Sequence, residues 1–246
     1  MQNRIFSFDS PKAIKSLGFG WLNAIHYMAP ADLAGVGNLC PHASAGCKAL
    51  CLGWHSGQAG MVATETALNS VRQSRIDKAR RFMRDRAAYM RDVVRSIELG
   101  IAKAERMGLR LAVRMNGSTD IAFEGIACVR DGKPYRNLML AFPDVQFVDY
   151  TKNARRFERA LPENYSLTLS RHEHNDDDVI RLVREKRGNA AIVFHTVPHE
   201  WNALPVINGD EHDLRHLDPR GVIVGLTPKG RKAKRDTSGF VIRNAA

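Results

Sequence analysis

Short apolar runs recur along the chain, and polar residues follow each of them directly. The first run spans residues 21–28 and is apolar apart from Asn23 and His26. Later runs of the same character lie at residues 109–115, 145–148, 165–169, 190–194 and 222–224. Runs of this length are typical of strands that are buried on both faces of a parallel sheet. The pattern therefore predicts about six strands.

Apolar residues recur at helical spacing between residues 64 and 107. Asp85 is suited to cap a helix, so this segment is interpreted as two helices with a break near Arg84. Shorter helical patterns cover residues 154–160 and 176–187. Residues 1–20 are interpreted as an irregular lead-in.

Strands that alternate with helices predict an α/β fold. The chain has 246 residues, 44% of them hydrophobic, and no linker divides it. We therefore expect one domain over residues 1–246, built as a partial (βα)6-type barrel. A cysteine-rich loop, residues 30–60, follows the first strand of this barrel.

Polar side chains at the ends of the predicted strands form the second candidate feature. Parallel strands bring their carboxyl ends to one rim, where α/β folds build their sites. We therefore expect a set of polar side chains to converge near the cysteine loop. These are Arg114, Asn116, Asp120, Asp149, Lys152, Arg171 and His195.

Three of the four cysteines, Cys40, Cys47 and Cys51, lie within twelve residues at C-x6-C-x3-C spacing. A disulfide would leave one thiol over, and a structural zinc site would need a fourth ligand such as His42 or His55. Buried thiols without a ligand are the remaining alternative. Three cysteines suit an iron–sulfur cluster that keeps one iron open, and this is the favoured interpretation. Cys128 is interpreted as a packed residue.

The formal net charge of +11 favours a polyanionic partner. Basic residues concentrate in the helical segment 64–107 and in the C-terminal segment 225–246. They predict contacts with a nucleic acid or nucleotide, and the alternative is a solvated helix face with a basic tail. No run is apolar and long enough for a membrane span, and no signal peptide is recognised, so we expect a cytoplasmic protein. The sequence makes no prediction of the oligomeric state.

Several segments resemble a family of uncharacterised phage-encoded proteins. They are the cysteine loop, residues 114–120, residues 149–153 and the ending at residues 234–241. The likeness spans most of the chain and implies no activity.

The organisation is more distantly similar to the radical S-adenosylmethionine enzymes. The resemblance implies a partial barrel whose loop after the first strand holds a [4Fe–4S] cluster through Cys40, Cys47 and Cys51, with S-adenosylmethionine on the open iron. Residues 221–225 also resemble a glycine-flanked strand of that superfamily. The chain departs from the family's C-x3-C-x2-C spacing and lacks its Gly-Gly-Glu motif, whose place residues 116–118 take.

The leading hypothesis is thus a radical-SAM-like enzyme that modifies a nucleic-acid base, including DNA bases, or a nucleotide. Each class of site residue is assigned under this hypothesis. Cofactor binding falls to Asn116, Ser118, Ser170 and Arg171, catalysis to Asp120, Asp149, Lys152 and His195, and substrate binding to Arg114, Tyr150, Arg72 and Arg75.

Two alternatives stay open. The first is an enzyme similar to the tRNA- or DNA-guanine transglycosylases, which insert 7-deazaguanines. In that reading Asp120 and Asp149 provide the nucleophile and the acid or base, and the cysteines hold structural zinc. The second is a non-enzymatic nucleic-acid-binding protein whose metal only fixes a loop.

Overall fold

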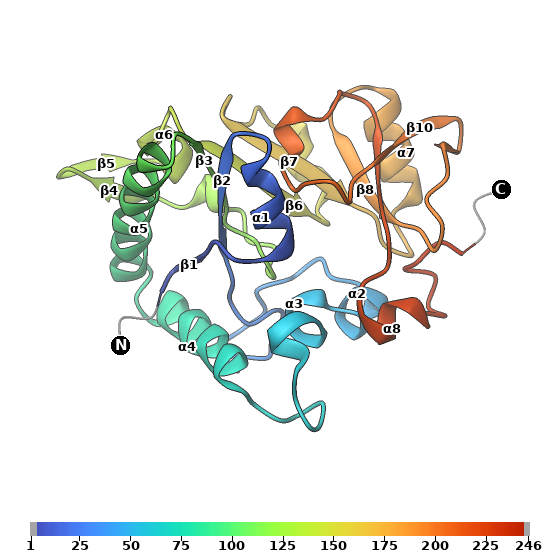
Figure 1. The fold of residues 1–246 in the computed structure, drawn as a ribbon, viewed down its shortest axis with the longest axis horizontal. Helices are drawn as coiled ribbons and strands as arrows, with labels where there is room; N and C mark the ends of the chain where they lie inside the picture. Colours follow the sequence, from blue (N-terminus) through green and yellow to red (C-terminus); the bar gives the residue numbers. More distant parts are fainter. Residues whose placement is uncertain (1–3, 244–246) are drawn as a thin grey trace.

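The computed structural model describes residues 4–243, and its main feature is one sheet of nine strands (Figure 1). The strand order is β1-β2-β3-β6-β7-β8-β11-β10-β9. Strands β2 to β10 of this order are parallel, and the edge strands β1 and β9 are antiparallel to their neighbours. The strands of this sheet are β1 (Phe6–Ser7), β2 (Trp21–His26), β3 (Arg110–Arg114), β6 (Gln146–Thr151), β7 (Tyr165–Ser170), β8 (Asn189–Val193), β9 (Glu200–Trp201), β10 (Leu204–Asn208) and β11 (Ile223–Leu226).

Helices and one hairpin connect these strands. The α-helices are α1 (Pro11–Leu17), α2 (Ala45–Ala49), α3 (Leu52–His55), α4 (Ser70–Arg84), α5 (Arg86–Arg106), α6 (Leu138–Ala141), α7 (Asp176–Arg184) and α8 (Gly230–Lys234). The 3-10 helices are η1 (Gly57–Gly60), η2 (Phe123–Gly125), η3 (Ala154–Glu158) and η4 (Arg215–Leu217), and the hairpin is β4 (Cys128–Arg130) with β5 (Lys133–Tyr135).

Alternation along the strands divides the sheet into two faces. Leu22 and Leu111 point to the face covered by α5, and Ile192 belongs to the same core cluster as Leu182 of α7. Trp21 and Ala112 point to the opposite face, where they pack on Leu214. Helices α1 and η4 lie on that second face, with α1 against β2 and η4 against β6 and β7. Every residue of β2 is buried, as expected for a strand covered on both sides.

The predicted α/β class and single domain are confirmed, with a large and mostly parallel sheet. The sheet has nine strands instead of about six, because the short edge strands β1 and β9 and the parallel strand β10 were not predicted. The break between the two long helices is also confirmed, because the Asp85 side chain accepts a hydrogen bond from Ala88 N and caps α5. The strand order does not establish the curvature of a barrel, and the partial barrel stays a prediction.

Three predictions about local structure are wrong. Residues 1–20 are not an irregular lead-in throughout, because they contain β1 and α1, the latter capped by Ser10 with Pro11 in its first turn. The helix predicted at 154–160 is the 3-10 helix η3. Helix α7 ends at Arg184 instead of residue 187, and Lys186 follows with a positive φ of 52°.

None of the helices in residues 4–243 has the length and apolar character needed to cross a bilayer. The basic C-terminal segment predicted at 225–246 includes α8, and its last three residues lie outside the described range. In Figure 1, α2, α3 and α8 gather below the sheet, on the side where β2 delivers the chain to the cysteines. Helices α3 and α8 are in contact there.

Candidate functional site

The cysteine loop lies at the carboxyl end of the sheet and contacts the loop that follows β3. The Cys40 thiol accepts a hydrogen bond from Ala31 N at 3.3 Å and donates one to Ser118 O at 3.7 Å. Cys47 is part of α2, where the Ser44 hydroxyl caps the helix by accepting from Cys47 N at 3.1 Å. Cys51 is the N-cap residue of α3. Two very short helices thus present two of the three thiols.

Burial raises the pKa of all three thiols, and neighbouring cysteines add to the rise at Cys40 and Cys51. Burial raises the pKa of Cys40 to about 12, and Cys51 and Cys47 add to the rise. Burial and the neighbouring Cys47 raise the pKa of Cys51 to about 11. Burial also raises the pKa of Cys47, against the opposing effect of the Lys152 ammonium group. Without a metal, all three thiols therefore hold their protons at neutral pH.

Each sulfur atom has one or two neighbouring donors that favour the thiolate form. They are Ala31 N–H at Cys40, the Lys152 side chain at Cys47, and the N–H groups of Gly53 and Trp54 at Cys51. Such donors stabilise the charge that collects when thiolates bind a soft metal. As the side chains are placed, however, no three His, Cys, Asp or Glu groups within residues 4–243 surround a common point where an ion could bind. These donors suit a metal centre. The three sulfur atoms would have to move closer together to bind one ion or cluster.

Lys152 and Ser170 join the thiols from the next two strands. Lys152 Nζ donates to Ser170 Oγ at 2.8 Å and hydrogen-bonds Cys47. The Phe240 ring lies under the same ammonium group, with 5.1 Å from Nζ to the ring centroid. Ser118 reaches the loop from β3, and its hydroxyl donates to Met28 O at 2.6 Å. Of the residues expected to converge on the cysteine loop, Lys152 therefore contacts a thiol, and Ser118 and Ser170, which were assigned to cofactor binding, lie beside it.

Asp120 connects the rim to the start of the cysteine loop. Its backbone N–H donates to Leu39 O at 2.9 Å, and its carboxylate accepts from Lys152 N at 2.8 Å. The other carboxylate oxygen pairs with Arg156 at 3.3 Å. The charge of Asp120 is close enough to raise the pKa of both Cys40 and Cys47.

Asp149, on β6, lies against the loop that follows β3, and only 1% of its surface is exposed. Its carboxylate accepts from Asn116 N at 2.7 Å, from Asn116 Nδ2 at 3.1 Å and from the Tyr165 hydroxyl at 3.2 Å. Burial raises the pKa of Asp149 to about 7, against the N–H of Asn116 and the charge of Arg114. Asp149 and Asn116 thus hold the loop after β3, and both side chains are buried. This burial disfavours the transglycosylase reading, which needs a free second carboxylate.

Arg114 and Tyr150 do not join the thiols, because they belong to the opposite face of the sheet. The Arg114 guanidinium lies 4.6 Å from the Tyr150 ring centroid and 3.3 Å from the Asp213 carboxylate. Lys12 of α1 pairs with the same carboxylate at 3.0 Å. We name Lys12, Arg114, Tyr150 and Asp213 the interior cluster. Arg114 and Tyr150 are part of an ion network between α1 and the sheet, and their role in substrate binding stays a prediction.

Arg72 is 1% exposed, and its guanidinium binds the protein's own backbone. It donates to four carbonyl oxygens, those of Trp54, Ala59, Glu65 and Ala67, over 2.7 to 2.9 Å. These bonds give Arg72 a structural role, in which it fixes the loop between α3 and α4, and they lend no support to the predicted role in substrate binding. Arg75 stacks on Tyr27 at 4.6 Å, donates to Gly53 O and opposes the raised pKa of Cys51.

Arg171 and His195 bind the C-terminal segment. Arg171 pairs with Asp176 at 2.6 Å and donates to the carbonyl oxygens of Gly239 and Phe240. His195 is exposed, and its backbone N–H donates to Ile242 O at 2.8 Å. The structure therefore gives both residues a role in placing Phe240 and its neighbours over the rim.

Glu173 is the rim residue to which sequence reasoning assigned no role. It follows β7, and its carboxylate accepts from Ser44 Oγ at 2.7 Å and from Gly46 N at 2.8 Å. A Cβ atom at Gly46 would lie 3.0 Å from both carboxylate oxygens, so glycine permits this approach. Its position directly after a strand is the signal that could have identified Glu173.

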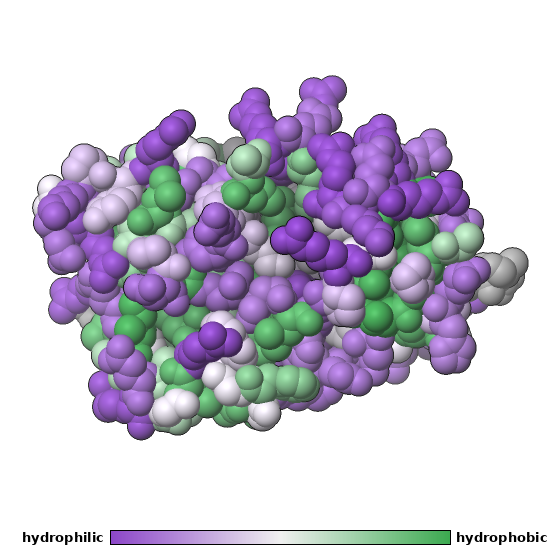
Figure 2. All heavy atoms as spheres, turned by 90° about the horizontal axis from the view of Figure 1, so that it is seen from above, coloured by the Kyte–Doolittle hydropathy of each residue, from purple (hydrophilic) through white to green (hydrophobic). Residues whose placement is uncertain are grey.

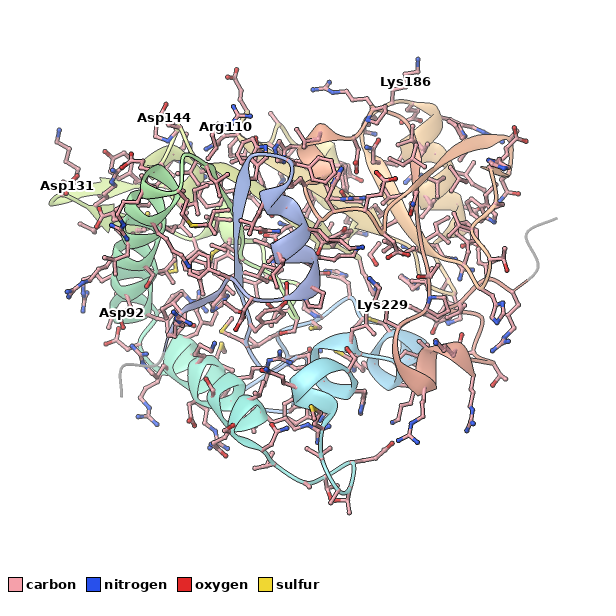
Figure 3. All side chains as sticks on the ribbon, viewed as in Figure 1. Asp92, Arg110, Asp131, Asp144, Lys186 and Lys229 are labelled. Carbon is pink, nitrogen blue, oxygen red and sulfur yellow. The ribbon has the colours of Figure 1, made fainter. Side chains whose placement is uncertain are left out.

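Much of the predicted basic segment is exposed, although part of it is structural. Arg84, Arg86, Arg91 and Arg95 are exposed on α4 and α5, whereas Lys78 is buried. Arg81 pairs with Asp92, which is labelled in Figure 3. At the start of α8, Lys229 pairs with Asp210 at 3.0 Å (Figure 3). Figure 2 shows hydrophilic side chains over most of the face drawn there, with apolar patches between them.

Comparison with known proteins identifies a family and no individual relative. The search of curated proteins found no match, and neither did the search of solved structures. The similarity to radical S-adenosylmethionine enzymes is thus not supported by a match. The model of the gene product 88 family matches residues 5–244, and the chain therefore belongs to that family.

Proposed function

We propose that this protein is an iron–sulfur enzyme of radical-SAM type that modifies a nucleic-acid base or a nucleotide. The observation that carries the proposal is the arrangement of Cys40, Cys47 and Cys51 at the carboxyl end of a parallel sheet. Cys47 raises the pKa of both Cys40 and Cys51, and each of the three thiols has a donor that favours thiolate. Sites of α/β folds lie at this end of the sheet.

In the proposed site, Cys40, Cys47 and Cys51 would hold a [4Fe–4S] cluster, which would supply an open iron to bind S-adenosylmethionine and an electron to reduce it. The chain's own residues prepare this site. The N–H donors and Lys152 favour loss of the thiol protons, which ligation requires. Ligation also requires the sulfurs to approach one another, and the short helices α2 and α3 are the elements that would shift.

Polar rim residues can bind the polar part of a cofactor. Lys152 and Ser170 are hydrogen-bonded to each other beside Cys47, and Ser118 lies beside Cys40. Among the residues assigned to catalysis, Lys152 and Asp120 are the ones that contact or electrostatically affect the thiols. They are the groups that we assign to cofactor binding and proton transfer in the proposed enzyme.

The proposed substrate class rests on charge. A net charge of +11 and the exposed arginines of α4 and α5 favour a polyanion. The basic residues around α8 lie beside α3, so positive charge also flanks the cysteine loop. A nucleic acid or a nucleotide is the polyanion that carries a base for such an enzyme to modify.

The test is the metal and the absorbance of protein purified without oxygen. The proposal expects iron with sulfide and absorbance in the iron–sulfur band, both restored by reconstitution. It also expects S-adenosylmethionine to alter that spectrum. Stoichiometric zinc, or reconstituted protein without iron, would overturn the proposal.

A further inference from the structure

A pocket of about 370 Å³ opens beside the cysteine loop. It lies between the start of that loop, the junction of α4 and α5, and the segment after β3. Phe82, Met83, Ile121 and Ile126 supply apolar walls. The volume falls within the range of roughly 300–1,000 Å³ that is usual for small-molecule sites.

The pocket also has a charged side, and its charges are fixed. Arg156 pairs with Glu124 at 2.6 Å and with Asp120 at 3.3 Å, and Asp120 and Arg156 both line the pocket. The Arg86 guanidinium lies 4.9 Å from the centroid of the Phe82 ring. A planar heterocycle meets both needs of such a pocket, because its faces are apolar and its edge carries donors and acceptors.

A second, cationic hollow adjoins the first across Met83. It has a volume of about 470 Å³ and is lined by Val36, Arg80, Met83 and Arg84. Arg80 is anchored by a hydrogen bond from Nε to Ala34 O at 3.0 Å. Arg84 is exposed at the end of α4. Guanidinium groups in this position suit a phosphate, which they bind through charge-assisted hydrogen bonds.

We propose that the two hollows form one nucleotide-binding site, with the base in the pocket lined by Phe82 and Ile126 and the phosphate at Arg80 and Arg84. The inference rests on the proposed function for its substrate class, a nucleotide, and it places that substrate. An apolar compartment beside a cationic one matches a molecule that is part heterocycle and part anion. It matches neither free phosphate nor an uncharged ligand.

The site is next to the thiols. Leu39 and Pro41, which flank Cys40 in the sequence, line the pocket. Asp120 lines the same pocket, and its charge acts on Cys40 and Cys47. A base bound in this pocket would lie beside Asp120 and next to the cysteine loop. This is the placement that a base-modifying enzyme needs.

Calorimetric titration of the full chain tests the site. The probes are the common ribonucleoside 5′-monophosphates, the matching nucleosides, and ribose 5-phosphate. Ala122 lines the pocket and is exposed, so Ala122→Trp can fill the pocket without entering the core. Arg84→Gln removes the phosphate contact. The matched controls are Ala63→Trp and Arg95→Gln, which alter exposed residues elsewhere.

A monophosphate should bind about tenfold more tightly than ribose 5-phosphate, because the base adds apolar and stacking contacts. Ala122→Trp should abolish binding, and Arg84→Gln should weaken monophosphate binding roughly tenfold while leaving nucleoside binding unchanged. Both controls should bind as the wild type does. Equal affinity for ribose 5-phosphate, unchanged binding by Ala122→Trp, or no binding by the wild type would overturn the inference.

Iron and sulfide content, measured on the same samples, separates this inference from the proposed function. The pocket variants should retain the wild-type iron content. If the reconstituted wild type holds no iron but binds the nucleotide, the iron–sulfur proposal is refuted and the nucleotide site is upheld. If the iron-loaded wild type does not bind the nucleotide, only the nucleotide site is refuted.

Discussion

The interior cluster and the cysteine site both consist of ionisable side chains at the same sheet. They differ in whether neighbouring charges outweigh the effect of burial on the pKa of the acidic group. In the interior cluster, burial opposes the charge of Asp213, but Lys12 and Arg114 outweigh it and hold its pKa at about 2. At the cysteine site, burial raises the pKa of the thiols, although N–H groups and Lys152 favour their ionisation. In the interior cluster, the carboxylate has its cations. At the cysteine site, N–H groups and Lys152 surround thiols that remain protonated. We infer a structural role for the interior cluster from this difference, and it supports our proposal of a ligand site at the cysteines.

Replacing Asp213 should give the largest loss of stability. Asp213→Asn removes a buried carboxylate that pairs with two half-buried cations, Arg114 at 3.3 Å and Lys12 at 3.0 Å. Lys12 keeps the more distant Asp210 at 3.8 Å. We expect a cost of about 3–5 kcal/mol. Urea unfolding of the variant measures it, with Asp144→Asn, an exposed position, as the control. A loss below about 1 kcal/mol, the worth of a surface pair, would show that the interior cluster is not structural.

Asp149 should make stability depend on pH in a defined window. Its pKa is raised to about 7 in the folded chain, against about 3.9 in an unfolded chain. The contribution of a raised pKa is fully present below the unfolded value and is lost as pH rises through the folded value. Wild-type stability should therefore fall between about pH 4 and pH 7, by about 1–4 kcal/mol.

Asp149→Asn should flatten that pH profile, because it removes the titrating carboxyl. Unfolding free energies from urea melts at several pH values provide the comparison. If wild type and variant decline in parallel over this window, another group is responsible and Asp149 is ionised in the folded chain.

Arg72→Gln should destabilise the loop between α3 and α4. Four carbonyl oxygens lose their charged donor, and we expect a loss of about 2–3 kcal/mol. Arg91→Gln, at an exposed position on α5, should have little effect on stability. Similar melting curves for the two variants would return Arg72 to the set of ligand-binding candidates.

Glu173→Gln should have the smallest effect, and it acts on the cysteine site. The neutral side chain weakens the bonds from Ser44 Oγ and Gly46 N, for a loss of about 1 kcal/mol. Amide hydrogen exchange should accelerate at Gly46 and Cys47 and stay unchanged in the interior cluster. Asp177→Asn, at an exposed position nearby, is the control. Unaltered exchange at Gly46 would show that Glu173 does not hold α2.

The sequence predicted the parts of the fold that local patterns determine. The apolar runs identified the parallel strands except β10, and Asp85 identified the start of α5. Cys128 is packed in the core, as expected for an isolated cysteine. Helix α1 was missed although Ser10 and Pro11 are a recognisable helix start.

The site was harder to predict because strand alternation gives the direction of a side chain only within the strand. Arg114 is the last residue of β3 and joins the interior cluster, whereas Asn116, two residues later, lies in the loop and binds Asp149. Position after a strand predicts the rim, but burial decides which side chains reach a ligand. The burial of Arg72 depends on the fold of residues 54–67, and no pattern in its helix indicates it.

The central claim is that Cys40, Cys47 and Cys51 hold one iron–sulfur cluster. The most direct test is the iron and sulfide content of chains reconstituted without oxygen, compared among wild type, Cys40→Ala and Cys128→Ala. The account predicts roughly four irons and four sulfides in the wild type, the same in Cys128→Ala, and a large loss in Cys40→Ala. Iron that persists in Cys40→Ala, or a wild type that takes up none, would contradict it.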